Sequence, residues 1–425
     1  MLITMLATGS RGDIQPYLAL GLAIEALGDY TVRIAAPENY ESWVKGFGLE
    51  FYPLSGDVSK LAKDPRVQKM KADNPLKIIL SFVMMDRSFK SLALKMQQDC
   101  YHACQGSDAI VYHPGAAIGY FVARALDIPS ILATPFPMTP TRDYPSLIFY
   151  DSLRLGQTFN LLTHLLFEQV MWRMSSSAVK QFWQQEFSSV PPNFSNPFKQ
   201  QQTQNAPTIV SGSNHVFPQP LDWPAQVFNT GYWFLDAGDN WHPPSDLEDF
   251  LKAGSPPVYV GFGSLGDPTQ AEQTTELVID ALQRSGQRGV LATGWSGMVK
   301  LDTVPDNIFI LESTPHAWLF PRMSAVVHHG GAGTTAAGLR AGVPSILIPH
   351  ANDQFAWGRR VWELGVGPKP IPRTQLSAEN LSAAITDALT EDVKQAAKLL
   401  GEKIQREKGA QTAAKVIVRC LTQCS

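Results

Sequence analysis

The stretch Ser324–Leu339, "SAVVHHGGAGTTAAGL", joins an apolar run, two histidines, a glycine-rich turn and the start of a helical segment. The apolar run predicts a buried strand that ends at Val327, and the residues from about Thr334 onward predict a helix. A strand, a glycine turn and a helix start, in this order, point several backbone N–H groups and the positive end of a helix dipole at one place. A phosphate fits that place. Glycines alone leave open a tight turn in which the threonines only cap the helix.

The alternation of short apolar strands with helical segments runs through both halves of the chain. The first half contains "MLITML", "DAIVYHP" and "PSILATP", and the second half contains "PPVYVGFG", "GVLATG", "IFILES" and "PSILIPH". Uninterrupted apolar strands separated by helices are typical of parallel sheets with both faces covered. We therefore predict an α/β protein with two Rossmann-like, doubly wound domains that face each other across a cleft. After the first strand, an apolar helical stripe predicts a helix that Gly28 ends.

The length of 425 residues exceeds what one hydrophobic core usually holds, so two domains are expected. A segment rich in Pro, Gly and Asp, 235–257, has the composition of a linker. The predicted domains are residues 1–238, residues 239–400, and a C-terminal helix at 401–425 that packs back on the first domain. Between about 135 and 224 the strand–helix alternation is lost, which predicts either an insertion that shapes a substrate site or a buried helical hairpin without a ligand.

Composition excludes several classes of protein. With a formal charge of -3 and 17% charged residues, the chain gives no electrostatic reason to expect nucleic acid. No stretch reaches the roughly 18 uncharged apolar residues of a membrane span, and the N-terminus lacks the pattern of a signal peptide. We expect a cytoplasmic protein that touches a membrane surface at most.

Two further features of the composition have alternative interpretations. The pairs Cys100/Cys104 and Cys420/Cys424 are each spaced to share a helix face, so a four-thiolate metal site can be drawn, but buried free cysteines are the favoured interpretation. The segment Lys60–Lys77 is basic. A solvated surface is favoured there over contact with anionic lipid.

The sequence "GFGSLG", Gly261–Gly266, fits the dinucleotide pattern G-x-G-x-x-G after a strand. The next strand ends without the carboxylate that would hold a ribose, and Asp267-Pro268 predicts a turn in place of a sustained helix. We interpret Gly263 and Ser264 as parts of a loop that faces the cleft. An NAD-dependent oxidoreductase remains the alternative from another class, and tight binding of NADH would identify it.

The sequence "GSRGD", Gly9–Asp13, follows the first strand, at the edge where ligands bind in open α/β sheets. Asp13 there could take a proton from an incoming hydroxyl group while the other domain's glycine loop holds a phosphate leaving group. The alternative is that Asp13 caps the following helix, with Pro16 in its first turn. No D-x-D pair occurs in the chain, so we expect backbone amides, a histidine and the helix dipole, and no metal ion, to stabilise the leaving group.

Several of these stretches together resemble the sterol 3-β-glucosyltransferases, which are family 1 glycosyltransferases with a GT-B fold. They include "GSRGDIQPYLALGL", "PVYVGFGSLGD" and "PHAWLFPRMSAVVHHGGAGTTAAGLRAGVPSILIPHANDQFAWGRR". The resemblance implies an inverting transfer of glucose from UDP-glucose, as co-substrate and without a cofactor or metal, to a sterol or similar lipid. It implies an N-terminal acceptor domain and a C-terminal UDP-sugar domain. Apart from the resemblance, we expect a monomer with peripheral membrane contact. A polyketide or carotenoid-like acceptor, and a non-catalytic lipid carrier, are the alternatives.

The resemblance also implies roles for individual residues. Asp13 falls on the general base, His329 on the histidine that contacts the diphosphate, and Asp353 with Gln354 on the pair that binds the sugar hydroxyls. Ala337 falls where plant relatives carry a glutamate for the ribose, so the ribose contact is unassigned. The full set of donor-binding residues is Ser10, Arg11, Gly12, Ser264, His316, His328, His329, Gly330, Gly331, Ala332, Gly333, Thr334, Thr335, Asp353 and Gln354.

Overall fold

The chain divides into two compact units, one formed by Met1–Leu235 together with Glu407–Ser425 and the other by Asp236–Arg406. Their coordinates come from a computed structural model. It describes residues 1–56, 87–151, 155–236, 241–263, 270–293, 298–299, 304–350 and 353–423. The basic segment Lys60–Lys77, Ser264 and Cys424 lie outside the described residues.

The described part of the first unit contains a seven-stranded parallel sheet with the strand order β3-β2-β1-β4-β5-β6-β7. Strand β1 lies between β2 and β4, with Met5 beside Ile34 on one side and Val111 on the other. The strands are β1 (Leu2–Leu6), β2 (Thr31–Pro37), β3 (Glu50–Leu54), β4 (Ala109–Tyr112), β5 (Ser130–Thr134), β6 (Thr208–Val210) and β7 (Val227–Asn229).

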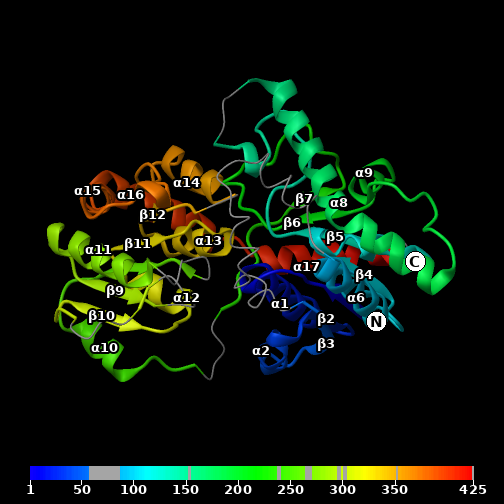
Figure 1. Ribbon diagram of the computed structural model, residues 1–425, viewed down its shortest axis with the longest axis horizontal. Coiled ribbons are helices and arrows are strands. Elements are labelled where there is room, and N and C mark those ends of the chain that lie inside the picture. The colour runs from blue at the N-terminus through cyan, green and yellow to red at the C-terminus, as the bar shows by residue number, and fades with distance from the viewer. Residues whose placement is uncertain are drawn as a thin grey trace. The chain divides into compact units, whose positions relative to one another are not determined.

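Helices cover both faces of this sheet (Figure 1). Because side chains alternate along a strand, Ile3 and Met5 of β1 enter the core that α1 and α17 close, whereas Leu6 enters the core that α6, α7 and α8 close. The helices of the unit are α1 (Arg11–Glu25), α2 (Glu41–Gly46), α6 (Arg87–Ala103), α7 (Ile118–Ala125), α8 (Gln157–Phe187), α9 (Pro197–Thr203) and α17 (Gly409–Gln423).

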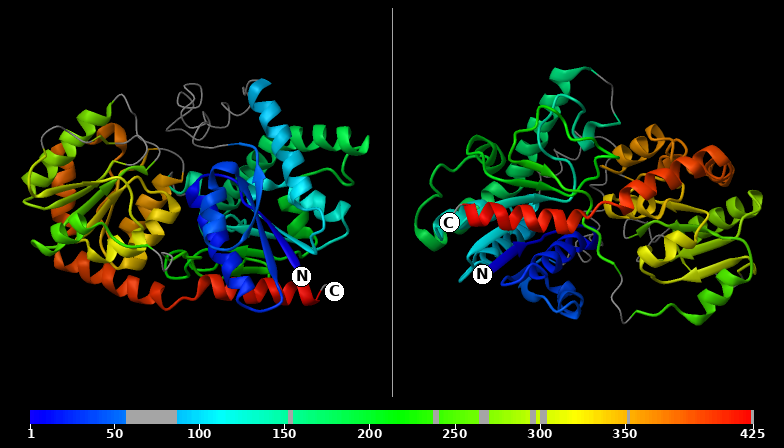
Figure 2. Two further views of the ribbon diagram at one scale, coloured as in Figure 1. Left: turned by 90° about the horizontal axis from the view of Figure 1, so that it is seen from below. Right: turned by 180° about the vertical axis from the view of Figure 1, so that it is seen from behind.

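The last helix of the chain, α17, packs against α1 in the first unit (Figure 2). Its first residue, Gly409, lies so close to the chain at Gly231 and Tyr232 that an added Cβ would sit 2.2 Å from the carbonyl oxygen of Tyr232. The glycine therefore allows α17 to begin directly against that backbone. From there Ala413, Ala414 and Ile417 reach the core that α1 shares.

The described part of the second unit contains a five-stranded parallel sheet with the order β10-β9-β8-β11-β12. Its strands are β8 (Val258–Gly261), β9 (Gly289–Ala292), β10 (Ile308–Leu311), β11 (Ala325–His328) and β12 (Ser345–Leu347). Its helices, on both faces, are α10 (Ser245–Lys252), α11 (Ala271–Arg284), α12 (His316–Leu319), α13 (Ala332–Ala341), α14 (Gln354–Glu363), α15 (Ala378–Ala388) and α16 (Glu391–Gln405). The prediction of two doubly wound parallel sheets is confirmed.

Local details differ from the sequence prediction. Helix α1 ends at Glu25, and Gly28 lies beyond it with φ +125°, in the turn toward β2. Strand β6 lies within the region 135–224, where no strand was predicted, because its three residues are too few to show a pattern. The longest described element of that region is a single helix, α8, in place of a hairpin.

Among the described helices, none is long and apolar enough to cross a bilayer. Within the described residues, no group of three or more His, Cys, Asp and Glu side chains is arranged to hold a metal ion. Cys100 and Cys104 are buried in the first unit as free thiols, and burial raises the pKa of Cys104 to about 12. These thiols therefore act as small apolar core residues.

The close approach at Gly409 makes a prediction about stability. Gly409→Ala places a methyl group against the backbone at Tyr232, so we expect a loss of about 1–3 kcal/mol and a fall of several degrees in the thermal unfolding midpoint. Gly46→Ala is the matched control, since nothing lies within 4 Å of the position of its Cβ. Equal midpoints for the two variants, in calorimetric scans, would contradict the packing described for α17.

Candidate functional site

The strand order of the first unit reverses between β1 and β4, because the chain proceeds outward from β1 to β3 and then returns to the other side. At such a switch point the loops at the carboxyl ends of two neighbouring strands diverge and leave a crevice in which ligands bind. The loop after β1 leads into α1, and Asp13 lies in the first turn of that helix. The sheet topology therefore brings Asp13 to the expected ligand-binding edge of its unit.

Hydrogen bonds fix the carboxylate of Asp13. Its Oδ2 accepts the backbone N–H of Ser10 at 2.7 Å and the Ser10 hydroxyl at 2.9 Å. Gly9, with φ +125°, makes room for this arrangement, because an added Cβ would lie 2.4 Å from Oδ2. Asp13 thus caps α1, as the alternative interpretation held. Its other oxygen, Oδ1, has no hydrogen-bond partner among the described residues, so the cap does not occupy the whole carboxylate.

The neighbours of Asp13 take different positions. Arg11 is directed toward α2, where its guanidinium lies 4.7 Å from the ring centre of Trp43. Pro16 is the sixth residue of α1, and not in the first turn as predicted. Because Pro16 has no N–H, the carbonyl of Gly12 loses its usual helical partner. That carbonyl belongs to the turn in which Asp13 lies.

In the second unit the strand order reverses between β8 and β11, and the glycine loop follows β11. Strand β11 ends at His328 and α13 begins at Ala332, one and two residues from the predicted limits. The residue before α13, Gly331, gives the helix no side-chain cap, so the first N–H groups of α13 are left for a ligand or water. Such a helix start favours an anion.

The threonines of α13 do not play equal parts. The hydroxyl of Thr335 is buried and donates to the carbonyl oxygen of Gly331 at 2.9 Å. The helix itself therefore uses the hydroxyl hydrogen of Thr335, a member of the predicted donor site, and does not leave it for a phosphate. Thr334 is half-buried and remains the hydroxyl group that the helix start presents.

His329 lies in a space that two glycines create. A Cβ added at Gly263 would lie 3.0 Å from Cε1 of His329, and a Cβ added at Gly331 would lie 2.6 Å from its Nε2. Burial lowers the pKa of His329 to about 4, and Nδ1 has no partner among the described residues. At neutral pH the ring is therefore uncharged. It contributes to an anion site as a hydrogen-bond donor and not as a cation.

His328 is fully buried, and its Nδ1 accepts the N–H of Gly330 at 3.1 Å. Burial, followed by the neighbouring His329 and His316, lowers the pKa of His328 well below its usual range. His316 itself stacks on Phe320 at 4.2 Å between ring centres. The three histidines predicted for the donor site are thus close enough to affect one another.

The Asp-Gln pair lies at the start of α14, next to the glycine loop. Gln354 is buried, and its Oε1 accepts the N–H of His350 at 2.8 Å. An added Cβ on Gly330 would lie 3.1 Å from the carbonyl oxygen of Gln354, which shows how closely α14 approaches the loop. Asp353 is half-buried, and its Oδ2 accepts the indole N–H of Trp357 at 3.1 Å.

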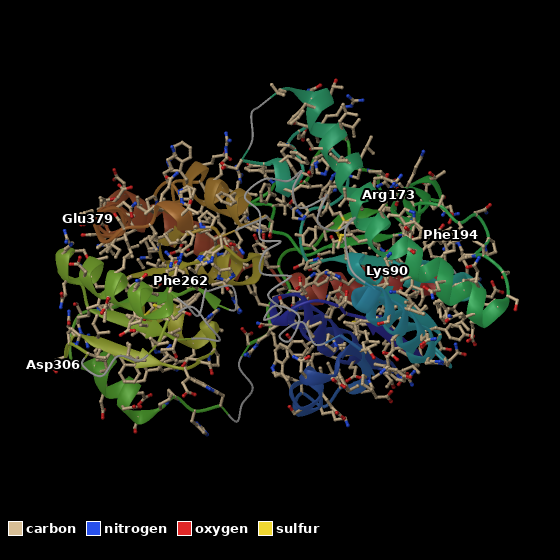
Figure 3. The ribbon with its side chains drawn as sticks, viewed as in Figure 1. Lys90, Arg173, Phe194, Phe262, Asp306 and Glu379 are labelled. Carbon is tan, nitrogen blue, oxygen red and sulfur yellow. The ribbon has the colours of Figure 1, made fainter. Side chains whose placement is uncertain are left out.

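The structure therefore gathers two groups of predicted residues, one in each unit. Ser10, Gly12 and Asp13 share the end of β1 and the start of α1. His328, His329, the glycine loop and Gln354 follow the carboxyl ends of β11 and β12, whereas His316 begins α12, after β10. Phe262, which follows β8 at the same edge of the second sheet, packs 5.8 Å from the ring of His350 (Figure 3). Chemically, the first group offers an ionisable carboxylate and the second an anion site built from N–H donors.

One residue of this edge was not predicted. His113 follows β4, the strand next to β1 at the switch point, and is buried there. The sequence "VYHPG" was interpreted only as a strand end. The signal for a site residue was a histidine directly after the strand that pairs with β1. The sequence alone does not give this strand pairing, so the signal can be recognised only from the structure.

Comparison with known proteins identifies the relatives of this chain. Residues 3–145 match the glycosyltransferase family 28 N-terminal domain, and residues 276–423 match the erythromycin biosynthesis protein CIII-like C-terminal domain. A sterol 3-beta-glucosyltransferase of Arabidopsis thaliana is 36% identical over 99% of this chain and 68% of its own length.

Solved structures agree on the fold. The glycotransferase of kitacinnamycin superposes with a TM-score of 0.71 at 21% identity, over 99% of each chain. The glycosyltransferase VinC, solved in complex with dTDP, gives 0.66 at 16% identity over 100% of each chain. With two doubly wound domains, matches to both family domains and 36% identity to a sterol 3-beta-glucosyltransferase over 99% of its residues, the chain belongs to the family 28 and CIII-like glycosyltransferases of the GT-B fold.

Proposed function

We propose that this protein transfers glucose from UDP-glucose to the 3-hydroxyl group of a sterol or a similar lipid, with inversion at the anomeric carbon and without a metal ion. The observation that carries the proposal is the 36% identity to a sterol 3-beta-glucosyltransferase across 99% of the chain. The bound dTDP of VinC supports a nucleoside diphosphate as the ligand of this fold.

In the proposed reaction the acceptor oxygen forms a bond to C1 of glucose on the face opposite the diphosphate. The bond from C1 to the diphosphate oxygen breaks, and its electron pair leaves with UDP. The proton of the acceptor hydroxyl goes to Asp13, whose Oδ1 is the carboxylate oxygen that the helix cap leaves without a partner. Asp13 can take up this proton only from its ionised form, in which both carboxylate oxygens are acceptors.

The leaving diphosphate needs stabilisation of its developing charge, which preorganised donors supply at low cost. The start of α13 and the neutral ring of His329 are such donors, since burial holds the pKa of His329 at about 4. Asp353 and Gln354 are the proposed partners of the sugar hydroxyls. Ser10, Arg11, Ser264 and His316 keep their proposed places beside the donor, and no described residue is assigned to the ribose.

Helix α8 supports peripheral contact with the membrane that holds a lipid acceptor. Leucines recur on one exposed side of its first half, with Leu162 57% and Leu165 44% exposed. Among the exposed side chains of α8 up to Met174, Arg173 is the one charged group and no acid occurs (Figure 3). An apolar helix face with a cation and without acids favours an anionic lipid surface.

The main test is a matrix of donors and acceptors, assayed with EDTA present. UDP-glucose, UDP-galactose and UDP-N-acetylglucosamine are each combined with cholesterol, ergosterol and plain lipid alcohols. We expect glucose transfer to the sterols.

The role of Asp13 is tested by substitution. We expect Asp13→Asn to lower kcat about 10²–10⁴-fold with unchanged UDP binding. Asp29→Asn, at an exposed position of the same unit, is the control. Transfer to other hydroxyl compounds alone would reject the sterol, and near-normal turnover by Asp13→Asn would remove it from the mechanism.

His329 makes a second prediction, which concerns the donor alone. His329→Ala removes a hydrogen bond to a charged phosphate oxygen. We therefore expect the variant to bind UDP about 10- to 100-fold more weakly, as measured by calorimetry. The ratio of the wild-type to the variant affinity should stay constant between about pH 6 and 8, because the pKa of His329 lies at about 4 in the free protein. His242→Ala, an exposed histidine of the same unit, serves as the control. If UDP affinity survived in His329→Ala, another group would have to hold the diphosphate.

The exposed leucines make a third prediction. Leu162→Ser combined with Leu165→Ser should reduce sedimentation with vesicles of phosphatidylcholine, phosphatidylserine and sterol by at least about tenfold, because each leucine contributes about 1.5–3 kcal/mol when buried. Leu399→Ser, with a similarly exposed leucine on α16, is the control. Transfer to sterol delivered in cyclodextrin should not change. Vesicle binding that the double variant retained would reject α8 as the contact.

A further inference from the structure

His113 lies at the switch point of the first unit, on the strand next to the one that precedes Asp13. It follows β4 directly, and its backbone N–H donates to the carbonyl of Leu6, the last residue of β1, at 2.9 Å. Its side chain is 7% exposed. The histidine is therefore built into the floor of the carboxyl edge and does not extend from the surface.

Contacts with Tyr17 and Thr8 place the ring next to α1 and the loop that precedes it. Tyr17 of α1 packs edge-on against the imidazole, 5.9 Å between ring centres. Asp13 is one helical turn before Tyr17 and so lies on the same face of α1. Thr8 precedes Gly9, the glycine that packs on Asp13. The hydroxyl oxygen of Thr8 lies 3.3 Å from Nδ1 of His113. Asp13 is also close enough to His113 to oppose the lowering of its pKa by burial.

The hydrogen bond of Gly115 fixes the proton of the ring. The backbone N–H of Gly115 reaches Nδ1 at 3.0 Å. Because an N–H group can only donate, Nδ1 must be the acceptor, and the proton of the neutral ring is then on Nε2. Burial lowers the pKa of His113 below its usual value, against the smaller opposing effect of Asp13, so this neutral form is the one that matters.

The Nε2–H group that results has no partner among the described residues. The hydroxyl oxygen of Thr134, which ends the next strand β5, is also buried without a partner. A buried polar group without a partner costs about 1–3 kcal/mol, so such groups at a ligand-binding edge need a partner that a ligand or an ordered water supplies. The partner of Nε2 must be an acceptor, and a hydroxyl oxygen is one.

The second unit shows the same arrangement at its own switch point. His328 ends β11, the strand that corresponds to β4 in the strand order, and its Nδ1 accepts the N–H of Gly330, two residues later, at 3.1 Å. Its Nε2 likewise has no partner among the described residues. Both sheets therefore place a His-x-Gly turn at the position where a ligand is expected.

We propose that His113 is an acceptor-binding residue, whose Nε2–H donates a hydrogen bond to the oxygen of the hydroxyl group that Asp13 deprotonates. This role rests on the proposed glycosyl transfer and deepens it. The oxygen keeps one lone pair for attack on C1, one for His113, and presents its proton to Oδ1 of Asp13. The site then recognises an alcohol specifically, because an acceptor without the hydroxyl leaves Nε2 unpaired.

Two substitutions separate the nitrogens of the ring. The oxygen of Asn can replace Nδ1 as acceptor for the Gly115 N–H, so His113→Asn keeps the turn and removes the Nε2 donor. The amide of Gln reaches the position of Nε2, so His113→Gln restores a donor there. Binding of cholesterol and of its analogue without the 3-hydroxyl is measured by displacement of a fluorescent sterol, together with UDP binding, thermal unfolding and steady-state kinetics.

We expect His113→Asn to bind cholesterol about 10- to 100-fold more weakly and to raise KM for cholesterol correspondingly, with UDP binding and the unfolding midpoint unchanged. The deoxy analogue should bind wild type and His113→Asn equally, and His113→Gln should recover most of the affinity for cholesterol. Equal cholesterol binding by wild type and His113→Asn would overturn the proposal, and so would equal losses for cholesterol and the deoxy analogue. A wild type that discriminates the two sterols but transfers no sugar would reject the proposed function and leave the binding role of His113 standing.

Discussion

The site residues of both units depend on backbone that approaches a functional side chain more closely than any Cβ permits. Gly9 stands against the carboxylate of Asp13, and Gly263 with Gly331 stands against the ring of His329. In each case a methyl group would displace the side chain. The glycines therefore fix where these groups lie, and the conformational freedom of Gly9 at φ +125° is needed as well as its small size.

This close packing also determines the charge state of the histidines. Each ring is enclosed, so its cationic form loses hydration, and burial is the largest cause of the lowered pKa of His113, His328 and His329. The chain thus supplies neutral donors at both sheet edges. The backbone N–H two residues after His113 and after His328 then selects the nitrogen that carries the proton.

The sequence predicts the regular parts of this arrangement and misses what depends on strand order. The apolar runs were sufficient for two parallel sheets, and the "HHGGAGTT" turn for a strand end and a helix start within two residues of their limits. His113 was missed because its neighbours Thr8 and Tyr17 are about a hundred residues away in the chain. The predicted donor site includes Thr335. Threonine in a helix often donates its hydroxyl hydrogen to the carbonyl four residues earlier, as Thr335 does here.

The two interpretations of Asp13, helix cap and general base, prove to use different oxygens of one carboxylate. Oδ2 accepts both hydrogen bonds from Ser10, which holds the side chain in one orientation and leaves Oδ1 at the sheet edge. A proton that arrives at Oδ1 does not disturb the bonds at Oδ2, because a protonated carboxyl still has an acceptor oxygen there. The cap can therefore persist while Asp13 changes its protonation state, so α1 need not move during a cycle of proton transfer.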